Sequence, residues 1–132
     1  MSIVQNEEHG HWWLLLQNES IGYWPQSIFS RMTNGAEQIN WGGEIVNDEP
    51  EGHHTPTQMG SGHFPREGYG KASYFRNIQY MDDANVFKDP EKLIPQATKP
   101  SCYDVQVGQD TSSDGGTFFY FGGPGYSDIC PT

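Results

Sequence analysis

Apolar and polar residues alternate along this chain over short stretches that are separated by glycine, proline and polar residues. Alternation with a period of two is typical of β-strands that bury one face. The pattern predicts about six or seven strands. The clearest of them are expected over residues 12–16, 21–24, 37–46, 71–81, 102–107 and 118–121. Such a series of short strands predicts an all-β fold of the sandwich or barrel type.

Two parts of the chain depart from this alternation. Residues 1–10 are polar and are expected to form a frayed tail, so the predicted domain covers residues 11–132. Residues 25–36 place Ile28, Phe29 and Met32 at helical spacing, with Gly35 as a stop. One short helix is therefore expected there, with Phe29 and Met32 packing on a sheet.

The stretch Glu37–Val46 combines a strand pattern with two adjacent glycines and a carboxylate. In a regular strand Glu44 shares one face with Gly42, while Trp41 shares the other face with Gly43. Glycine inside a strand often marks a bulge or the close approach of a ligand or another backbone. Glu44 is thus either a solvated surface residue beside a bulge or a carboxylate next to a bound substrate.

The composition narrows the classes of partner. The chain has 132 residues and a net charge of −10, from seven basic and seventeen acidic residues. A nucleic acid or an anionic membrane surface would require a basic patch, so neither is expected as a partner. The first ten residues lack the basic start and apolar run of a signal peptide, and no stretch is apolar enough to span a membrane.

Cysteine and histidine give no recognisable metal motif. Cys102 and Cys130 lack zinc-ligand spacing and are either a disulfide or two free thiols. The five histidines form no His-Glu-x-x-His pattern, and Ser61 does not lie in a Gly-x-Ser-x-Gly elbow. No metal and no cofactor are therefore expected. Asn18-Glu19-Ser20 fits the N-glycosylation sequon, which matters only in a secreted chain.

Aromatic residues make up 14% of the chain and include Tyr69, Tyr74 and Tyr120. Most of them are expected in the core and at its rim. A few on one open face could stack on sugars or on proline rings.

Several motifs occur in order along the chain. They are Trp12-Trp13-Leu14, Ile21-Gly22-Tyr23-Trp24-Pro25, Trp41-Gly42-Gly43-Glu44, Met59-Gly60-Ser61-Gly62-His63-Phe64-Pro65, the stretch 68–79, Cys102-Tyr103-Asp104, the stretch 120–125 and Cys130-Pro131. Together they resemble the plant neprosin domain. The resemblance begins near residue 11 and implies a secreted protein with an antiparallel β-sandwich.

The resemblance also implies an activity. It points to a glutamic endopeptidase that works in acid, cleaves after proline and uses two glutamates on a concave sheet face. Glu44 corresponds to the downstream glutamate, and Trp41, Gly42 and Gly43 are expected to contact the peptide substrate. The resemblance further implies that Cys102 and Cys130 form the family's disulfide.

The chain matches only the C-terminal half of that catalytic domain, so a partial sandwich is expected, and the missing N-terminal half is a candidate partner. Carboxylate catalysis of peptide hydrolysis needs both an acid and a base, and two adjacent carboxyls share one proton because like charges repel. With Glu44 alone, the chain is expected to hydrolyse little or nothing. The alternatives are a non-catalytic module that binds proline-rich peptides or carbohydrate, and a nonfunctional remnant that melts without cooperativity.

Overall fold

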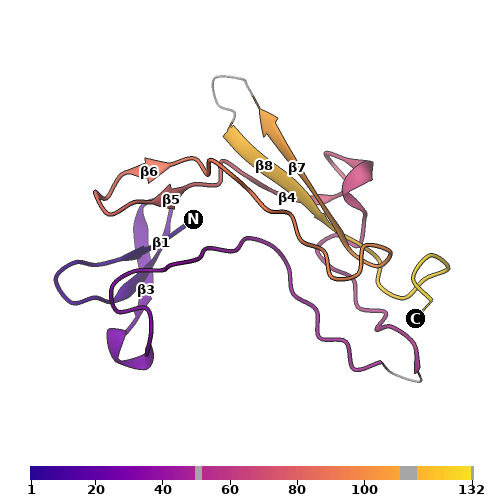
Figure 1. Ribbon diagram of the computed structural model, residues 1–132, viewed down its shortest axis with the longest axis horizontal. Helices are drawn as coiled ribbons and strands as arrows, with labels where there is room; N and C mark the ends of the chain where they lie inside the picture. Colours follow the sequence, from indigo (N-terminus) through magenta and orange to yellow (C-terminus); the bar gives the residue numbers. More distant parts are fainter. Residues whose placement is uncertain (50–51, 111–115, 132) are drawn as a thin grey trace. The chain divides into compact units, whose positions relative to one another are not determined.

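The computed structural model describes residues 1–49, 52–110 and 116–131 (Figure 1). It divides into two compact units, Met1–Asn40 and Trp41–Thr132. The boundary predicted at residue 10 falls inside the first unit. Nearly all regular structure consists of antiparallel strands, which confirms the all-β class. Face-to-face packing of two sheets as a sandwich stays a prediction.

The first unit is a three-stranded antiparallel sheet in the order β1-β2-β3. The strands are β1 (Ser2–Gln5), β2 (Trp12–Leu16) and β3 (Glu19–Trp24). Gln17 and Asn18 join β2 to β3 with φ angles of 51° and 66°. Positive φ at both central residues is the backbone of a tight hairpin turn that follows the natural twist of the strands. The strands predicted over residues 12–16 and 21–24 are confirmed as β2 and within β3.

The expected frayed tail is wrong for Ser2–Gln5, because these residues pair with β2. Ile3 and Val4 lie opposite Leu14 and Trp13, so β-branched side chains extend the apolar surface of the neighbouring strand.

The helix expected over residues 25–36 is wrong in extent. Only one 3-10 turn forms, η1 (Gln26–Ile28), and Phe29 is already extended with φ −104° and ψ 128°. The carbonyl of Met32 accepts hydrogen bonds from Trp12 Nε1 at 3.2 Å and from Gln5 Nε2 at 3.3 Å. Side chains of the sheet therefore bind a backbone group that a longer helix would have used internally.

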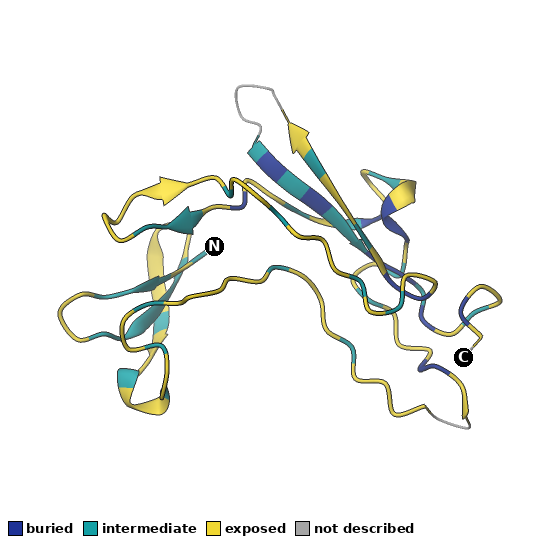
Figure 2. Ribbon diagram, viewed as in Figure 1, coloured by how far each residue is buried: buried dark blue, intermediate teal, exposed yellow. Residues whose placement is uncertain are grey.

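The second unit contains a three-stranded antiparallel sheet in the order β4-β8-β7. Its strands are β4 (Ser73–Arg76), β7 (Asp104–Asp110) and β8 (Gly116–Gly122). Buried and half-buried residues alternate along the central strand β8 (Figure 2), where Thr117 and Phe119 are both 3% exposed. The strand predicted over residues 118–121 is confirmed within β8, and the strand predicted over residues 102–107 is confirmed from Asp104 onward, as β7.

The long strand predicted over residues 71–81 is wrong, because the chain bends after β4. Asn77 has a φ of 51°, a left-handed conformation that asparagine tolerates better than most residues. The chain then forms a two-stranded ribbon of β5 (Tyr80–Met81) and β6 (Phe87–Lys88). In the turn of this ribbon, the carboxylate of Asp82 binds Lys88 and the backbone amides of Val86 and Ala84. These interactions lower the pKa of Asp82.

A second 3-10 turn, η3 (Pro65–Glu67), precedes β4. The Glu67 carboxylate is hydrogen-bonded to His63 Nδ1 at 3.0 Å and accepts a hydrogen bond from the Phe64 amide at 3.0 Å. These two bonds, the one from His63 first, hold the pKa of Glu67 below its ordinary value. No helix among the described residues has the length and apolar composition required to cross a membrane.

Candidate functional site

The segment around Glu44 is not a strand. Residues 36–49 form no strand and no helix. The alternating pattern was present, but a strand also requires a hydrogen-bonded neighbour, and none of the described strands pairs with this segment. The strand prediction for Glu37–Val46 is therefore wrong, and the two faces assigned to that strand no longer apply.

Side-chain packing, rather than backbone pairing, anchors this segment to the second unit. A methyl group built on Gly43 would lie 2.9 Å from Met59 Cγ and 3.2 Å from Phe121 Cε2, so Met59 and Phe121 already occupy the space beside the Gly43 backbone. Ile45 packs against the buried disulfide cluster formed by Cys102, Tyr103 and Cys130. The residues on both sides of Glu44 are thus held in contact with the protein.

Between these anchors the Glu44 side chain is exposed. Among the described residues, no hydrogen bond or ion pair engages its carboxylate. Gly42 is exposed too, with no atom within 4 Å of a built Cβ, and Trp41 is half-buried. The result is an accessible carboxylate beside a bare stretch of backbone, where a group from another molecule can approach it. Substrate contacts at Trp41, Gly42 and Gly43 stay predictions.

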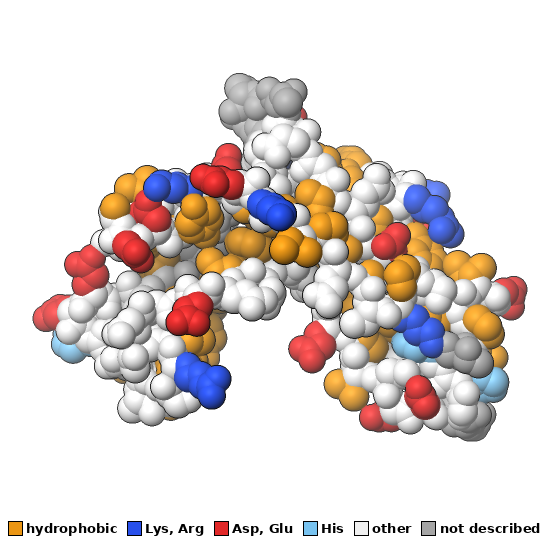
Figure 3. Space-filling model, viewed as in Figure 1, with side chains coloured by type: hydrophobic (Ala, Val, Ile, Leu, Met, Phe, Trp, Pro, Cys, Tyr) orange, Lys and Arg blue, Asp and Glu red, His pale blue; other side chains and the backbone are white. Residues whose placement is uncertain are grey.

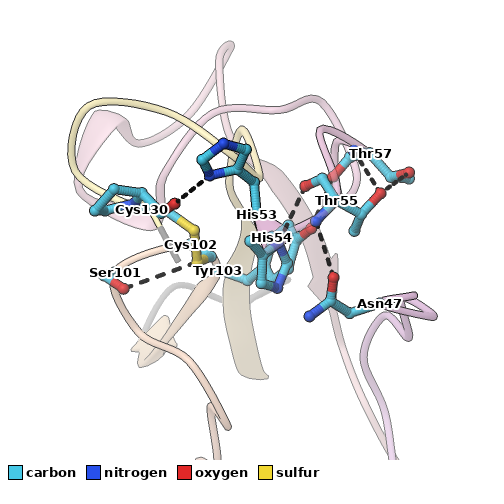
Figure 4. Close-up of a disulfide and its surroundings, with 10 residues drawn as sticks. Asn47, His53, His54, Thr55, Thr57, Ser101, Cys102, Tyr103 and Cys130 are labelled. Carbon is cyan, nitrogen blue, oxygen red and sulfur yellow. Dashed lines mark hydrogen bonds between the residues drawn. A yellow bond between two sulfur atoms is a disulfide. The ribbon is translucent and has the colours of Figure 1, made fainter. Parts of the chain in front are cut away.

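The disulfide cluster beside this segment is buried. Cys102 and Cys130 are bonded to each other and are both fully buried, which confirms the disulfide that the resemblance implied (Figure 4). Tyr103 donates a hydrogen bond from its hydroxyl to the Thr57 carbonyl at 2.8 Å, and burial raises its pKa. The cluster fixes the C-terminal segment against the loop that follows Glu44.

His54 was not singled out by the sequence, although it lies in this cluster and is only 5% exposed. Its ring meets Tyr103 edge-on at 5.3 Å, and its Nδ1 lies 3.0 Å from the Thr55 carbonyl oxygen. Potential ligand atoms of His54, Cys102 and Cys130 lie within 4.8 Å of one another. Because the two sulfurs are bonded to each other, they provide no thiolate, which is the form of cysteine that binds metals.

A hollow lies on one face of the sheet β4-β8-β7 and has a volume of about 240 Å³. Tyr69, Tyr74 and Tyr120 supply aromatic rings to it, and Arg76 and Asp110 supply charge. We call it the aromatic groove. The sequence named these tyrosines as possible stacking residues but could not bring them together, because the groove depends on β4 and β8 pairing across more than forty residues.

Asn18 lies at the exposed tip of the β2–β3 hairpin, in unit 1. An oligosaccharide attached there would extend into solvent without disturbing the sheet. Glycosylation of Asn18 stays a prediction.

Acidic side chains are spread over the visible surface and do not gather in one patch (Figure 3).

A comparison with protein-family models matches the family described as Neprosin, over residues 1–124 of the chain.

Proposed function

Because the chain belongs to the neprosin family, we propose that Glu44 is one carboxyl of a two-glutamate centre that hydrolyses proline-containing peptides in acid. The observation that carries this proposal is the exposed carboxylate of Glu44 between two anchored neighbours, Gly43 and Ile45. A backbone held by packing on both sides of an accessible carboxylate is an arrangement that can position this carboxylate for catalysis.

One carboxyl does not complete the chemistry. Hydrolysis needs a base that activates water and an acid that protonates the leaving amine. Two neighbouring carboxyls provide both, because their repulsion keeps one of them protonated in mild acid. Glu44 shares no hydrogen bond with another carboxyl among the described residues. The second acid would come from another polypeptide segment, and the chain by itself would hydrolyse little or no peptide.

The experiment compares the chain alone with the chain mixed with the upstream half of a complete neprosin domain. The substrate is a proline-containing peptide at acid pH, and mass spectrometry detects the products. The expected result is negligible cleavage by the chain alone and cleavage after proline in the mixture. Glu44→Gln should abolish the cleavage, because the amide cannot exchange a proton, whereas the exposed neighbour provides the control Asp48→Asn, which should leave it intact.

Robust cleavage that persists in Glu44→Gln would refute the assignment of Glu44. We also propose that the protein is secreted, because its disulfide persists in an oxidising compartment. Assembly in the mixture should then require the oxidised form of Cys102 and Cys130.

A further inference from the structure

The disulfide cluster includes a buried histidine that the proposed peptidase centre does not use. One ring nitrogen of His54 and the sulfurs of Cys102 and Cys130 lie within 4.8 Å of one another, and all three residues are buried. In the oxidised protein the two sulfurs are bonded to each other. Reduction of that bond would leave two thiols and an imidazole in one buried space. These are the groups that bind zinc in proteins.

The ring of His54 is held in the way that is usual for a metal-binding histidine. Its Nδ1 lies 3.0 Å from the Thr55 carbonyl oxygen. Because a carbonyl oxygen only accepts hydrogen bonds, Nδ1 carries the proton in this contact, and Nε2 keeps the lone pair that a metal requires. Ligating histidines almost always donate their other ring N–H to a carbonyl or a carboxylate, which fixes the ring.

The groups around the imidazole and the sulfurs are held by further contacts (Figure 4). The Thr55 amide donates a hydrogen bond to Asn47 Oδ1 at 2.9 Å, and the ring of Tyr103 packs edge-on against the imidazole. The hydroxyl of Ser101 lies 3.8 Å from Cys102 Sγ and donates to it, since a disulfide sulfur has no hydrogen. The same hydroxyl would stabilise the negative charge of a thiolate at Cys102.

The dimensions of the cluster suit a small tetrahedral ion. With Zn–S bonds of about 2.3 Å and Zn–N bonds of about 2.0–2.1 Å, tetrahedral geometry places the ligand atoms roughly 3.5–3.8 Å apart. Small side-chain shifts reach this spacing from the present one, in which the atoms lie within 4.8 Å. Three protein ligands leave a fourth position for water. Calcium and magnesium prefer oxygen ligands, which these three side chains do not supply.

We infer that the disulfide cluster is a redox-controlled metal site that binds Zn²⁺ through His54, Cys102 and Cys130 when the disulfide is reduced. A dithiol supplies the two electrons and becomes a disulfide itself, while the bond between the two cysteines breaks and each sulfur gains a proton. Zn²⁺ then displaces both protons, because the thiolate is the form that binds metals. The metal and the disulfide thus close the same loop, whose ends are 28 positions apart.

The experiment compares the oxidised and the reduced forms of the whole chain. Because both sulfurs are buried, the disulfide is reduced with dithiothreitol in urea, and the chain is refolded under argon after the dithiothreitol has been removed. Co²⁺ is the probe, since its bonds to thiolates give a charge-transfer absorption that histidine and carboxylate ligands do not give. The reduced chain should show this absorption and lose it when Zn²⁺ is added, and the oxidised chain should not show it.

Two adjacent histidines provide matched variants. His54→Ala removes a ligand and should weaken Co²⁺ binding by roughly tenfold or more, because loss of an outer-shell partner alone costs about 10–100-fold. His53→Ala should bind like the parent, since this exposed ring contacts Tyr126 and the Pro131 carbonyl instead. Glu44→Gln should also bind equally well, so the result is independent of any peptidase activity.

A stability measurement tests the site without any substitution, and therefore also where removal of a buried imidazole disturbs folding. Zn²⁺ should raise the urea midpoint of the reduced chain, because a ligand that binds only the folded state stabilises that state. The urea midpoint of the oxidised chain should not change, since its sulfurs are bonded to each other.

Three results would overturn the inference. The first is a reduced chain that gives no thiolate-to-cobalt absorption. The second is Co²⁺ binding that His54→Ala leaves unchanged or that His53→Ala weakens equally. The third is an equal stabilisation of the oxidised and reduced chains by Zn²⁺, which would mean that the metal binds side chains outside the disulfide cluster.

Discussion

Two adjacent glycines, Gly42 and Gly43, allow a matched test of how the Glu44 segment is held. Neither has a positive φ, so alanine can adopt both backbone conformations. At Gly42 a new methyl group would meet no atom within 4 Å. At Gly43 it would lie 2.9 Å from Met59 Cγ, 3.0 Å from Met59 Sδ and 3.2 Å from Phe121 Cε2, which is closer than the usual 3.5–4.0 Å between carbon atoms.

These contacts set the expected magnitudes. Gly42→Ala should stabilise the chain by about 0.4–1 kcal/mol, because alanine reduces the conformational entropy of the unfolded state. Gly43→Ala has the same gain but adds an overpacking cost of about 1–3 kcal/mol. The two variants should therefore differ by about 1–3 kcal/mol in the free energy of unfolding, with Gly43→Ala the less stable. That difference corresponds to roughly 4 °C in melting temperature per kcal/mol for a chain of this size.

The assay is urea denaturation of the purified chain and the two variants, followed by tryptophan fluorescence. Equal stabilities of Gly42→Ala and Gly43→Ala would refute the reasoning, because they would mean that the segment is not packed on Met59 and Phe121. A melt of the unmodified chain without a cooperative transition would favour the alternative of a nonfunctional remnant.

Three further predictions concern stability and modification. Replacing both cysteines in Cys102→Ala/Cys130→Ala should cost about 3–4 kcal/mol, the loop entropy of a bridge that spans 28 residues, measured by urea denaturation. Glu67→Gln should make stability less sensitive to acid: the lowered pKa of Glu67 contributes stability above about pH 4.3, the ordinary glutamate value, and loses it as the pH falls through the lowered pKa. Thermal melts across that range compare the variant with the parent. Expression through a eukaryotic secretory pathway should add a glycan to Asn18, and Ser20→Ala should remove that added mass while keeping the turn.

Each of these has a result that contradicts it. Unchanged stability of the double cysteine variant would mean that the bridge contributes nothing to folding. Identical pH profiles for Glu67→Gln and the parent would show that the pKa of Glu67 is not lowered by folding. A secreted chain whose mass is unaffected by Ser20→Ala would show that the sequon is not used.

The strands that could be predicted from sequence are those whose hydrogen-bonded partner strand lies nearby in the chain. β7 and β8 follow each other in the chain, and Trp12–Leu16 is followed at once by its partner. The Glu37–Val46 pattern was equally regular, yet no strand formed, since local alternation cannot supply a neighbour. The bend after β4 depends on the left-handed backbone of one residue, Asn77. It could not be predicted, because apolar and polar residues alternate on both sides of it.

The candidate site could be predicted only in part. The resemblance implied the disulfide, which is confirmed, and it named Glu44 as a catalytic residue, which stays a prediction. The contact of Gly43 with Phe121 and the position of His54 beside Cys102 could not be predicted, since each joins residues nearly fifty or more positions apart. Such contacts arise from tertiary packing, which no local pattern encodes.

The strand order β4-β8-β7 has a consequence for how this sheet assembles. β7 and β8 are consecutive strands in the chain, whereas Ser73 pairs with Phe121, more than forty residues further along. The entropy of closing a loop rises with its length, so local hairpins close before distant strands meet. β8 therefore acquires its first neighbour early and its second neighbour late, and until β4 arrives one full edge of β8 is open to any other extended chain.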